Sequence, residues 1–125
     1  MYAVAVRRTF IARHFLIGGD WGAESLPNSH QYVFELQLES PQVDEHGYVC
    51  DIDQIQLHMG QLVARYREAM LNDLPEFEGI NPSLENFAQI LARELGKRIR
   101  LDSISSLRVV LWENPEAWAS FTISR

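Results

Sequence analysis

A chain of 125 residues with 46% hydrophobic and 22% charged residues has the size and composition of one folded domain spanning residues 1–125, and it lacks an apolar run long enough to cross a membrane. Its net charge of −6 excludes a general nucleic-acid binder, because contact with phosphates needs clustered Lys and Arg. The single cysteine excludes an internal disulfide and, with a start that does not resemble a secretory signal, predicts a cytoplasmic protein.

Alternating hydrophobicity predicts two strands in the first third of the chain. Between Tyr2 and Phe15 the sequence alternates, which predicts a long strand. The residues that share one parity are Tyr2, Val4, Val6, Phe10, Ala12 and His14. A loop with Gly and Pro follows, and residues 31–39 then alternate between large apolar side chains and Gln or Glu. The second pattern is typical of a strand with one buried face and one polar face.

Two amphipathic helices are predicted next. Apolar residues recur at helical spacing from about Asp53 to Leu71, which predicts the first helix. Asn81 is a predicted N-cap for the second helix, with Pro82 at its first position. The apolar stripe of this helix reaches Leu95, and the following glycine is only a weak stop signal.

Two further strands, residues 105–113 and 118–125, are predicted on either side of the turn "NPEA". The order β-β-α-α-β-β predicts an α+β fold, with a four-stranded antiparallel sheet backed by two helices. The open edges of such long strands expose unpaired backbone groups. We therefore expect a homo-oligomer formed by sheet extension.

The predicted hairpin of the first two strands brings His14 and His30 together at its loop end. Zinc accepts imidazole nitrogen, and a catalytic zinc usually has three protein ligands and one open position. Asp20 or Glu24, from the intervening loop, could complete the set, whereas Asn28 offers only a neutral amide oxygen. The alternative is that both histidines are ordinary strand-end residues with satisfied hydrogen bonds.

Three other residues each admit a functional and a structural interpretation. Glu113 falls on the inward parity of its strand, where it could bind the N–H groups of a ligand or form a salt bridge to an arginine. Ser83 lies at a helix start, where capping alone would explain it. Cys50 lies among apolar residues and is interpreted as a small buried side chain rather than a nucleophile.

Five phrases of the sequence, FIARHFL, SHQY, HGYVCDID, LNDLPEFEGINPSLENFA and VVLWE, resemble the 6-pyruvoyl-tetrahydropterin synthase and 6-carboxy-tetrahydropterin synthase family in order and spacing. The resemblance covers almost the whole chain. It implies the family's tunnelling fold, in which sheets join into a barrel as a trimer or hexamer with pterin sites between subunits. It also implies a zinc ion, held by three histidines, that acts on the side chain of a dihydroneopterin triphosphate.

The resemblance assigns roles to matching residues. It implies that His14 and His30 bind the zinc, that Glu113 anchors the pterin ring, and that Ser83 lies near the pterin pocket. The third zinc-binding histidine of the family is replaced by Asn28 in this sequence.

Two catalytic positions of the family also differ. Glu24 stands where many members carry a cysteine, although some members use a glutamate in that region, and Arg67 and Glu68 replace an Asp-His pair. We therefore predict a divergent lyase in which a metal is bound at His14 and His30 and in which Glu24 or Glu68 moves the proton. The alternative is a non-catalytic paralogue that binds a pterin or an assembly partner and has lost the zinc-dependent chemistry.

Overall fold

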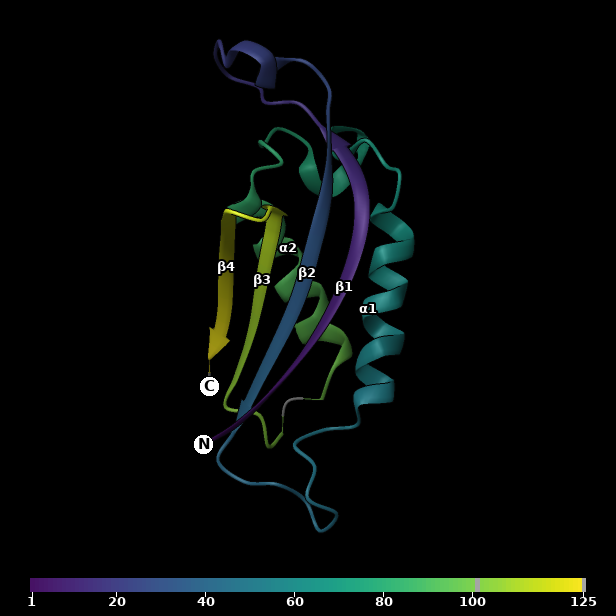
Figure 1. The fold of residues 1–125 in the computed structure, drawn as a ribbon, viewed down its shortest axis with the longest axis vertical. Helices are drawn as coiled ribbons and strands as arrows, with labels where there is room; N and C mark the ends of the chain where they lie inside the picture. Colours follow the sequence, from purple (N-terminus) through teal and green to yellow (C-terminus); the bar gives the residue numbers. More distant parts are fainter. Residues whose placement is uncertain (101, 125) are drawn as a thin grey trace.

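The computed structural model describes residues 1–100 and 102–124, and over this range an antiparallel sheet carries helices on one face (Figure 1). Its strands lie side by side in the order β1 (Tyr2–His14), β2 (Asn28–Ser40), β3 (Ser106–Asn114) and β4 (Ala117–Ser124). The α-helices are α1 (Ile52–Tyr66) and α2 (Leu84–Arg98), and the short 3-10 helices are η1 (Gly22–Ser25), η2 (Leu71–Asp73) and η3 (Pro75–Phe77). The predicted order of elements is confirmed, while Arg125, the last residue of the predicted final strand, lies outside the described residues.

The register of the sheet makes the first hairpin longer than the second. β1 and β2 pair along their full length, from Tyr2 opposite Ser40 to His14 opposite Asn28. β3 pairs only with the Val33–Glu39 part of β2. The β1–β2 hairpin therefore extends beyond the end of β3, and its tip carries the loop that contains η1 (Figure 1).

The hydrophobic core lies between the inner face of the sheet and the two helices. As the alternation predicts, the inner-face positions of β2 are almost fully buried, and the apolar stripes of both helices pack against them. Near the hairpin extension the core is aromatic: the ring of Tyr32 stacks on Phe10 and meets Phe87 edge to face, each at 5.4 Å between ring centroids. In the described residues no helix is long and apolar enough to cross a membrane.

The outer face of the sheet carries polar side chains together with Val33, Val110 and Trp112, and one of its acids is buried. Glu35 is only 7% exposed, because it accepts hydrogen bonds from Arg7 and Gln37. Burial alone would raise the pKa of Glu35, but these hydrogen bonds outweigh it and lower the pKa.

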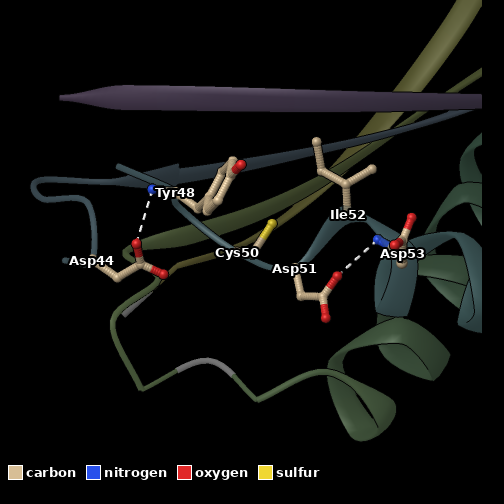
Figure 2. A pocket seen from close by; sticks show the side chains of 6 residues that line it. All are labelled: Asp44, Tyr48, Cys50, Asp51, Ile52 and Asp53. Atoms are coloured by element: carbon tan, nitrogen blue, oxygen red, sulfur yellow. Dashed lines mark hydrogen bonds between the residues drawn. The ribbon is translucent and has the colours of Figure 1, made fainter. Parts of the chain in front are cut away.

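The helix α1 begins as the sequence predicts and ends earlier. Its N-cap is Asp51, whose carboxylate accepts from the backbone N–H of Asp53 at 2.9 Å (Figure 2). The helix ends at Tyr66, so the predicted end at Leu71 is wrong. The cause is tertiary, because the N–H of Glu68 donates to the carbonyl of Ile11 in β1 at 2.7 Å and draws the chain out of the helix.

The helix α2 begins two residues later than predicted. Its N-cap is Ser83, whose hydroxyl accepts from the N–H of Asn86 at 3.1 Å. The prediction of Asn81 as the cap with Pro82 at the first helical position is wrong. The Asn81 side chain instead accepts a hydrogen bond from the N–H of Ile17, at 2.6 Å, across the fold.

Candidate functional site

The structure brings the two histidines at the end of the long hairpin into contact. His14 ends β1 and His30 lies near the start of β2, on the same inner face, with ring centroids 4.8 Å apart. His14 is only 3% exposed. Alternation along two antiparallel strands is sufficient to place both rings on one side of the hairpin.

The surroundings of His14 favour the neutral form of its imidazole. Burial lowers the pKa of His14 and the neighbouring His30 lowers it further, while Glu24 and the carbonyl of Pro82 only partly oppose these effects. The Tyr32 hydroxyl lies 3.1 Å from Nδ1 of His14. In the tautomer with hydrogen on Nδ1, the Nε2 lone pair of His14 is free to bind a metal.

His30 has a buried nitrogen that the protein does not satisfy. Its Nε2 atom is buried and has no hydrogen-bond partner among the described residues. Leaving such a group unsatisfied costs about 1–3 kcal/mol. A cation bound to this nitrogen would remove the cost, and this observation argues against the interpretation of His30 as an ordinary strand-end residue.

Glu113 joins the histidines from the second hairpin. The pairing of β3 shifts between Trp112 and Asn114, so Glu113 lies at an irregularity of the strand. The side chain of Asn114 then closes the turn by accepting from the N–H of Glu116 at 2.8 Å. One ligand atom each from His14, His30 and Glu113 lies within 4.8 Å of the other two.

This set of donors fits a divalent metal ion. Two imidazoles and a carboxylate are zinc ligands, and the same set is found in hydrolytic zinc enzymes. The sequence predicted the histidine pair and Glu113 as separate parts of a site, and the structure places them in one cluster.

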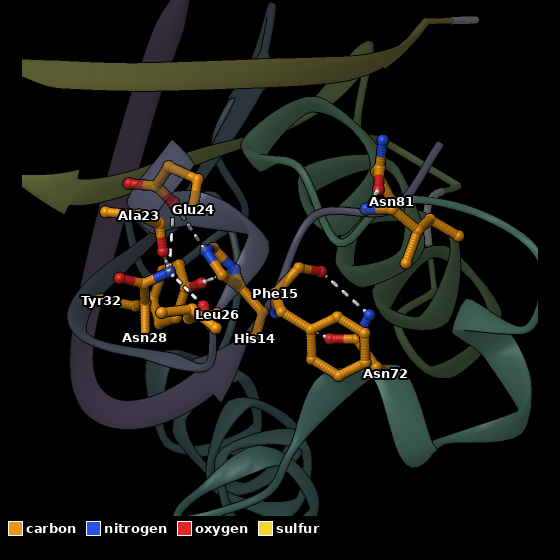
Figure 3. A network of polar contacts seen from close by, with 10 residues as sticks. His14, Phe15, Ala23, Glu24, Leu26, Asn28, Tyr32, Asn72 and Asn81 are labelled. Atoms are coloured by element: carbon orange, nitrogen blue, oxygen red, sulfur yellow. Dashed lines mark hydrogen bonds and ion pairs between the residues drawn. The ribbon is translucent and has the colours of Figure 1, made fainter. Parts of the chain in front are cut away.

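Glu24 faces the cluster from the loop at the hairpin tip. Its Oε2 atom lies 3.9 Å from Nε2 of His14, and its side chain is 48% exposed. The Asn28 amide donates to the carbonyl of Leu26 at 2.7 Å and to Oε2 of Glu24 at 3.4 Å (Figure 3). Asn28 is therefore a hydrogen-bonding neighbour of Glu24. The third candidate from this loop, Asp20, is exposed and accepts from the N–H of Gly22, and its carboxylate is not part of the described cluster.

Two asparagines fix the chain where it leaves β1. The side chain of Asn72 accepts from the N–H of Phe15 at 3.0 Å and donates to the carbonyl of the same residue at 2.9 Å (Figure 3). Asn81 binds the N–H of Ile17. These bonds position His14, and the sequence analysis missed them, because an amide in a loop carries no signal of its distant partner.

The remaining candidates, Ser83 and Glu68, form no hydrogen bond or ion pair with the cluster among the described residues. Ser83 follows Pro82, whose carbonyl contacts His14, and its hydroxyl caps α2. Glu68 is exposed and has a left-handed backbone with φ of 61°. No hydrogen bond or ion pair among the described residues joins its carboxylate to the histidines.

A cavity of about 560 Å³ lies at the outer face of the sheet and is lined by Arg7, Gln31, Val33, Trp112, Glu113, Asn114 and Pro115. Its volume is in the range of small-molecule sites. Of the cluster, Glu113 is the residue that reaches this cavity. A second cavity, of about 450 Å³, lies in the β2–α1 connection around Cys50 (Figure 2). Burial and then Asp51 raise the pKa of the Cys50 thiol, so it is not a nucleophilic thiolate at neutral pH.

A family model and several solved structures match the chain over almost its whole length. Residues 3–124 match the family described as 6-pyruvoyl tetrahydropterin synthase. Among solved structures, the chain is similar to a variant of Plasmodium vivax 6-pyruvoyltetrahydropterin synthase in which a catalytic glutamate is replaced by cysteine. The TM-score is 0.80 at 16% identity, covering 99% of this chain and 98% of that one. The search of curated proteins found no match.

Two further solved structures share the fold. The 6-pyruvoyl tetrahydropterin synthase of Caenorhabditis elegans gives a TM-score of 0.78 at 20% identity, over 99% of this chain and 98% of that one. An uncharacterized protein from Wolinella succinogenes gives 0.71 at 16% identity, over 96% of this chain and 97% of that one. The tunnelling-fold topology expected from the sequence is confirmed.

Proposed function

Since the chain belongs to the 6-pyruvoyl tetrahydropterin synthase family, we propose that it is a metal-dependent lyase acting on the side chain of a dihydroneopterin-like substrate. The observation that carries this proposal is the convergence of His14, His30 and Glu113, whose ligand atoms lie within 4.8 Å of one another beside a cavity. A buried, neutral imidazole and a buried nitrogen without a partner both support metal binding at this point.

His14 and His30 would hold the ion, zinc being the metal that suits imidazole and carboxylate ligands in this family's chemistry. When bound, the ion would polarise oxygen atoms of the substrate side chain and make neighbouring protons more acidic. The protein residues around it position the substrate and move the proton.

Glu24 is the proposed base that removes a proton from the substrate side chain. Its carboxylate lies 3.9 Å from His14, is held by the Asn28 amide, and is exposed enough to meet a substrate. The similar Plasmodium vivax enzyme has a catalytic glutamate, which supports a glutamate in this role. Glu68 is the alternative base, because a strained left-handed backbone at a non-glycine residue is often found at functional sites.

The pterin-type ring would lie in the cavity beside Glu113. A carboxylate can accept two N–H groups of such a ring in parallel. Trp112 and Val33 line the same cavity and offer apolar surface to a flat ring. Ser83 would contribute its hydroxyl from the start of α2, next to the Pro82 carbonyl that contacts His14.

Turnover of dihydroneopterin triphosphate tests the lyase and assigns its base. We expect wild-type turnover, a loss of at least about 100-fold in Glu24→Gln, and little change in Glu68→Gln. Glu116→Gln, at an exposed glutamate of the β3–β4 turn, is the matched control. The reverse result for the two variants would assign Glu68 as the base.

A non-catalytic pterin-binding or assembly paralogue is the second candidate. It is favoured by Asn28 in place of a histidine and by Arg67 and Glu68 in place of the family's Asp-His pair. The zinc content of protein purified without an affinity tag separates the candidates. Less than about a tenth of an equivalent per subunit, with tight pterin binding intact, would establish the paralogue and refute the lyase.

A further inference from the structure

We propose that Glu113 is the third protein ligand of the metal, replacing the imidazole that Asn28 does not supply. One carboxylate oxygen would bind the ion together with His14 and His30, and the other would stay available to the ring in the cavity. The inference rests on the metal site of the proposed function, and it gives Glu113 a role beyond ring binding.

The first hairpin supplies only two metal-binding side chains on its inner face. Asn28 lies directly opposite His14 in the β1–β2 register, so a side chain at this position is well placed to join the cluster. However, Asn28 is a neutral amide, which is a poor zinc ligand. Among the described residues, Glu113 is the acid that forms a cluster with both histidines.

The second hairpin places Glu113 where that ligand is needed. Regular pairing between β2 and β3 ends at Val33 opposite Trp112, and Glu113 is the next residue along β3. It falls on the inner parity set by Leu111, whose side chain is buried in the core. The carboxylate therefore points toward the part of β2 that extends beyond β3, where His30 lies.

The three groups converge without bonding to one another. Their ligand atoms lie within 4.8 Å, while ligands around a tetrahedral zinc are about 3.3 Å apart for bonds of about 2.0 Å. Among the described residues no hydrogen bond or ion pair connects Glu113 to His14 or His30. This is the arrangement of ligands around a cation, and a side-chain shift on the order of 1 Å would complete it.

The charge of Glu113 has no competing partner in the described structure. Arg7 lines the same cavity, but its guanidinium is paired with Glu35. The salt bridge to an arginine, which the sequence left open as an alternative for Glu113, is therefore not formed among the described residues. A half-buried carboxylate in this position is stabilised by a bound cation.

Zinc affinity measured without any pterin tests the inference, because a residue that only binds the ring would not affect it. In chelator competition we expect Glu113→Gln to weaken zinc binding at least tenfold, and on the order of 100-fold. Glu116→Gln should stay within about twofold of wild type. Affinity of Glu113→Gln within about threefold of wild type would overturn the inference and leave Glu113 as a ring-binding residue.

A double-mutant cycle with Asn28→His separates ligand loss from damage to the fold. A histidine at position 28 would stand opposite His14 and supply the third imidazole. In this background Glu113→Gln should cost less than about threefold in zinc affinity. An equal loss in both backgrounds would show that the substitution acts through the fold, and would overturn the inference.

The two proposals fail in different ways. Wild-type protein that binds zinc through Glu113 but does not turn over dihydroneopterin triphosphate would refute the lyase and leave the ligand set standing. Wild-type protein that binds no zinc would overturn the ligand set directly.

Discussion

Glu76 is held by two neighbouring side chains of α1. Its carboxylate accepts two hydrogen bonds from Arg65 and one from the Tyr66 hydroxyl, each at 2.7 Å. The bonds from Arg65, opposed by burial and aided by Tyr66, lower the pKa of Glu76 to about 2 from its ordinary 4.5. These bonds hold η3 against α1. They thereby also fix one end of the loop that leads to α2.

The depressed pKa of Glu76 predicts a pH-dependent stability. Because the folded-state pKa lies below the unfolded one, the stabilisation is complete above about pH 4.5 and is lost as the pH falls toward 2. We expect Glu76→Gln to lower the free energy of unfolding by about 2 kcal/mol at pH 7, and by progressively less below pH 4.5. Urea unfolding at several pH values measures this.

Glu94→Gln is the control for this prediction, because Glu94 pairs with Lys97 and Arg98 at the surface and should contribute less than about 0.5 kcal/mol. A Glu76→Gln effect of equal size at pH 7 and pH 3 would contradict the assigned pKa.

At the scale of elements, Ser83 illustrates how a capping residue and a binding residue can be distinguished. Its hydroxyl caps α2, so Ser83→Ala should lower the free energy of unfolding by about 1 kcal/mol, while Ser83→Asn should change it little. If the hydroxyl also contacts substrate, both variants should raise KM. Urea unfolding measures the capping contribution of the two variants, and steady-state kinetics measures their KM. An unchanged KM in Ser83→Asn would mean that Ser83 caps the helix and does not contact the substrate.

The elements show which features can be derived from sequence. The strands and their inner faces were predicted from alternation, because core contact dictates that pattern, and the hairpin implied the contact of His14 with His30. The ends of the helices were not predicted, because they depend on tertiary bonds, such as that of Glu68 with Ile11. The inward direction of Glu113 was predicted from alternation, but its closeness to the histidines was not, because that depends on where the pairing of β3 with β2 ends.

At the scale of the whole molecule, the edges of the sheet predict assembly. Part of the outer edge of β1 is covered by the segment that follows α1. The backbone N–H of Arg13 donates to the carbonyl of Ala69, and the N–H of Glu68 donates to the carbonyl of Ile11. Within the described residues no other strand pairs with the outer edge of β4 or with the first half of β1. Such long exposed edges favour pairing with another copy of the chain.

We expect the protein in solution to be a trimer or hexamer rather than a monomer of 14.4 kDa. Size-exclusion chromatography with light scattering should give a mass of about three or six times the chain mass, because closure of sheets into a barrel removes the open edges. A monomeric mass at micromolar concentration would contradict assembly through the sheet.

The tryptophans of the second hairpin provide an intrinsic fluorescence signal close to Glu113. Trp112 lines the cavity beside Glu113, and its ring lies 6.1 Å from that of Trp118. A reduced pterin absorbs where indole emits, so a ring bound in this cavity would quench the intrinsic fluorescence by energy transfer. Binding of a pterin in this cavity, as proposed, can thus be followed by fluorescence in the same sample in which zinc is titrated.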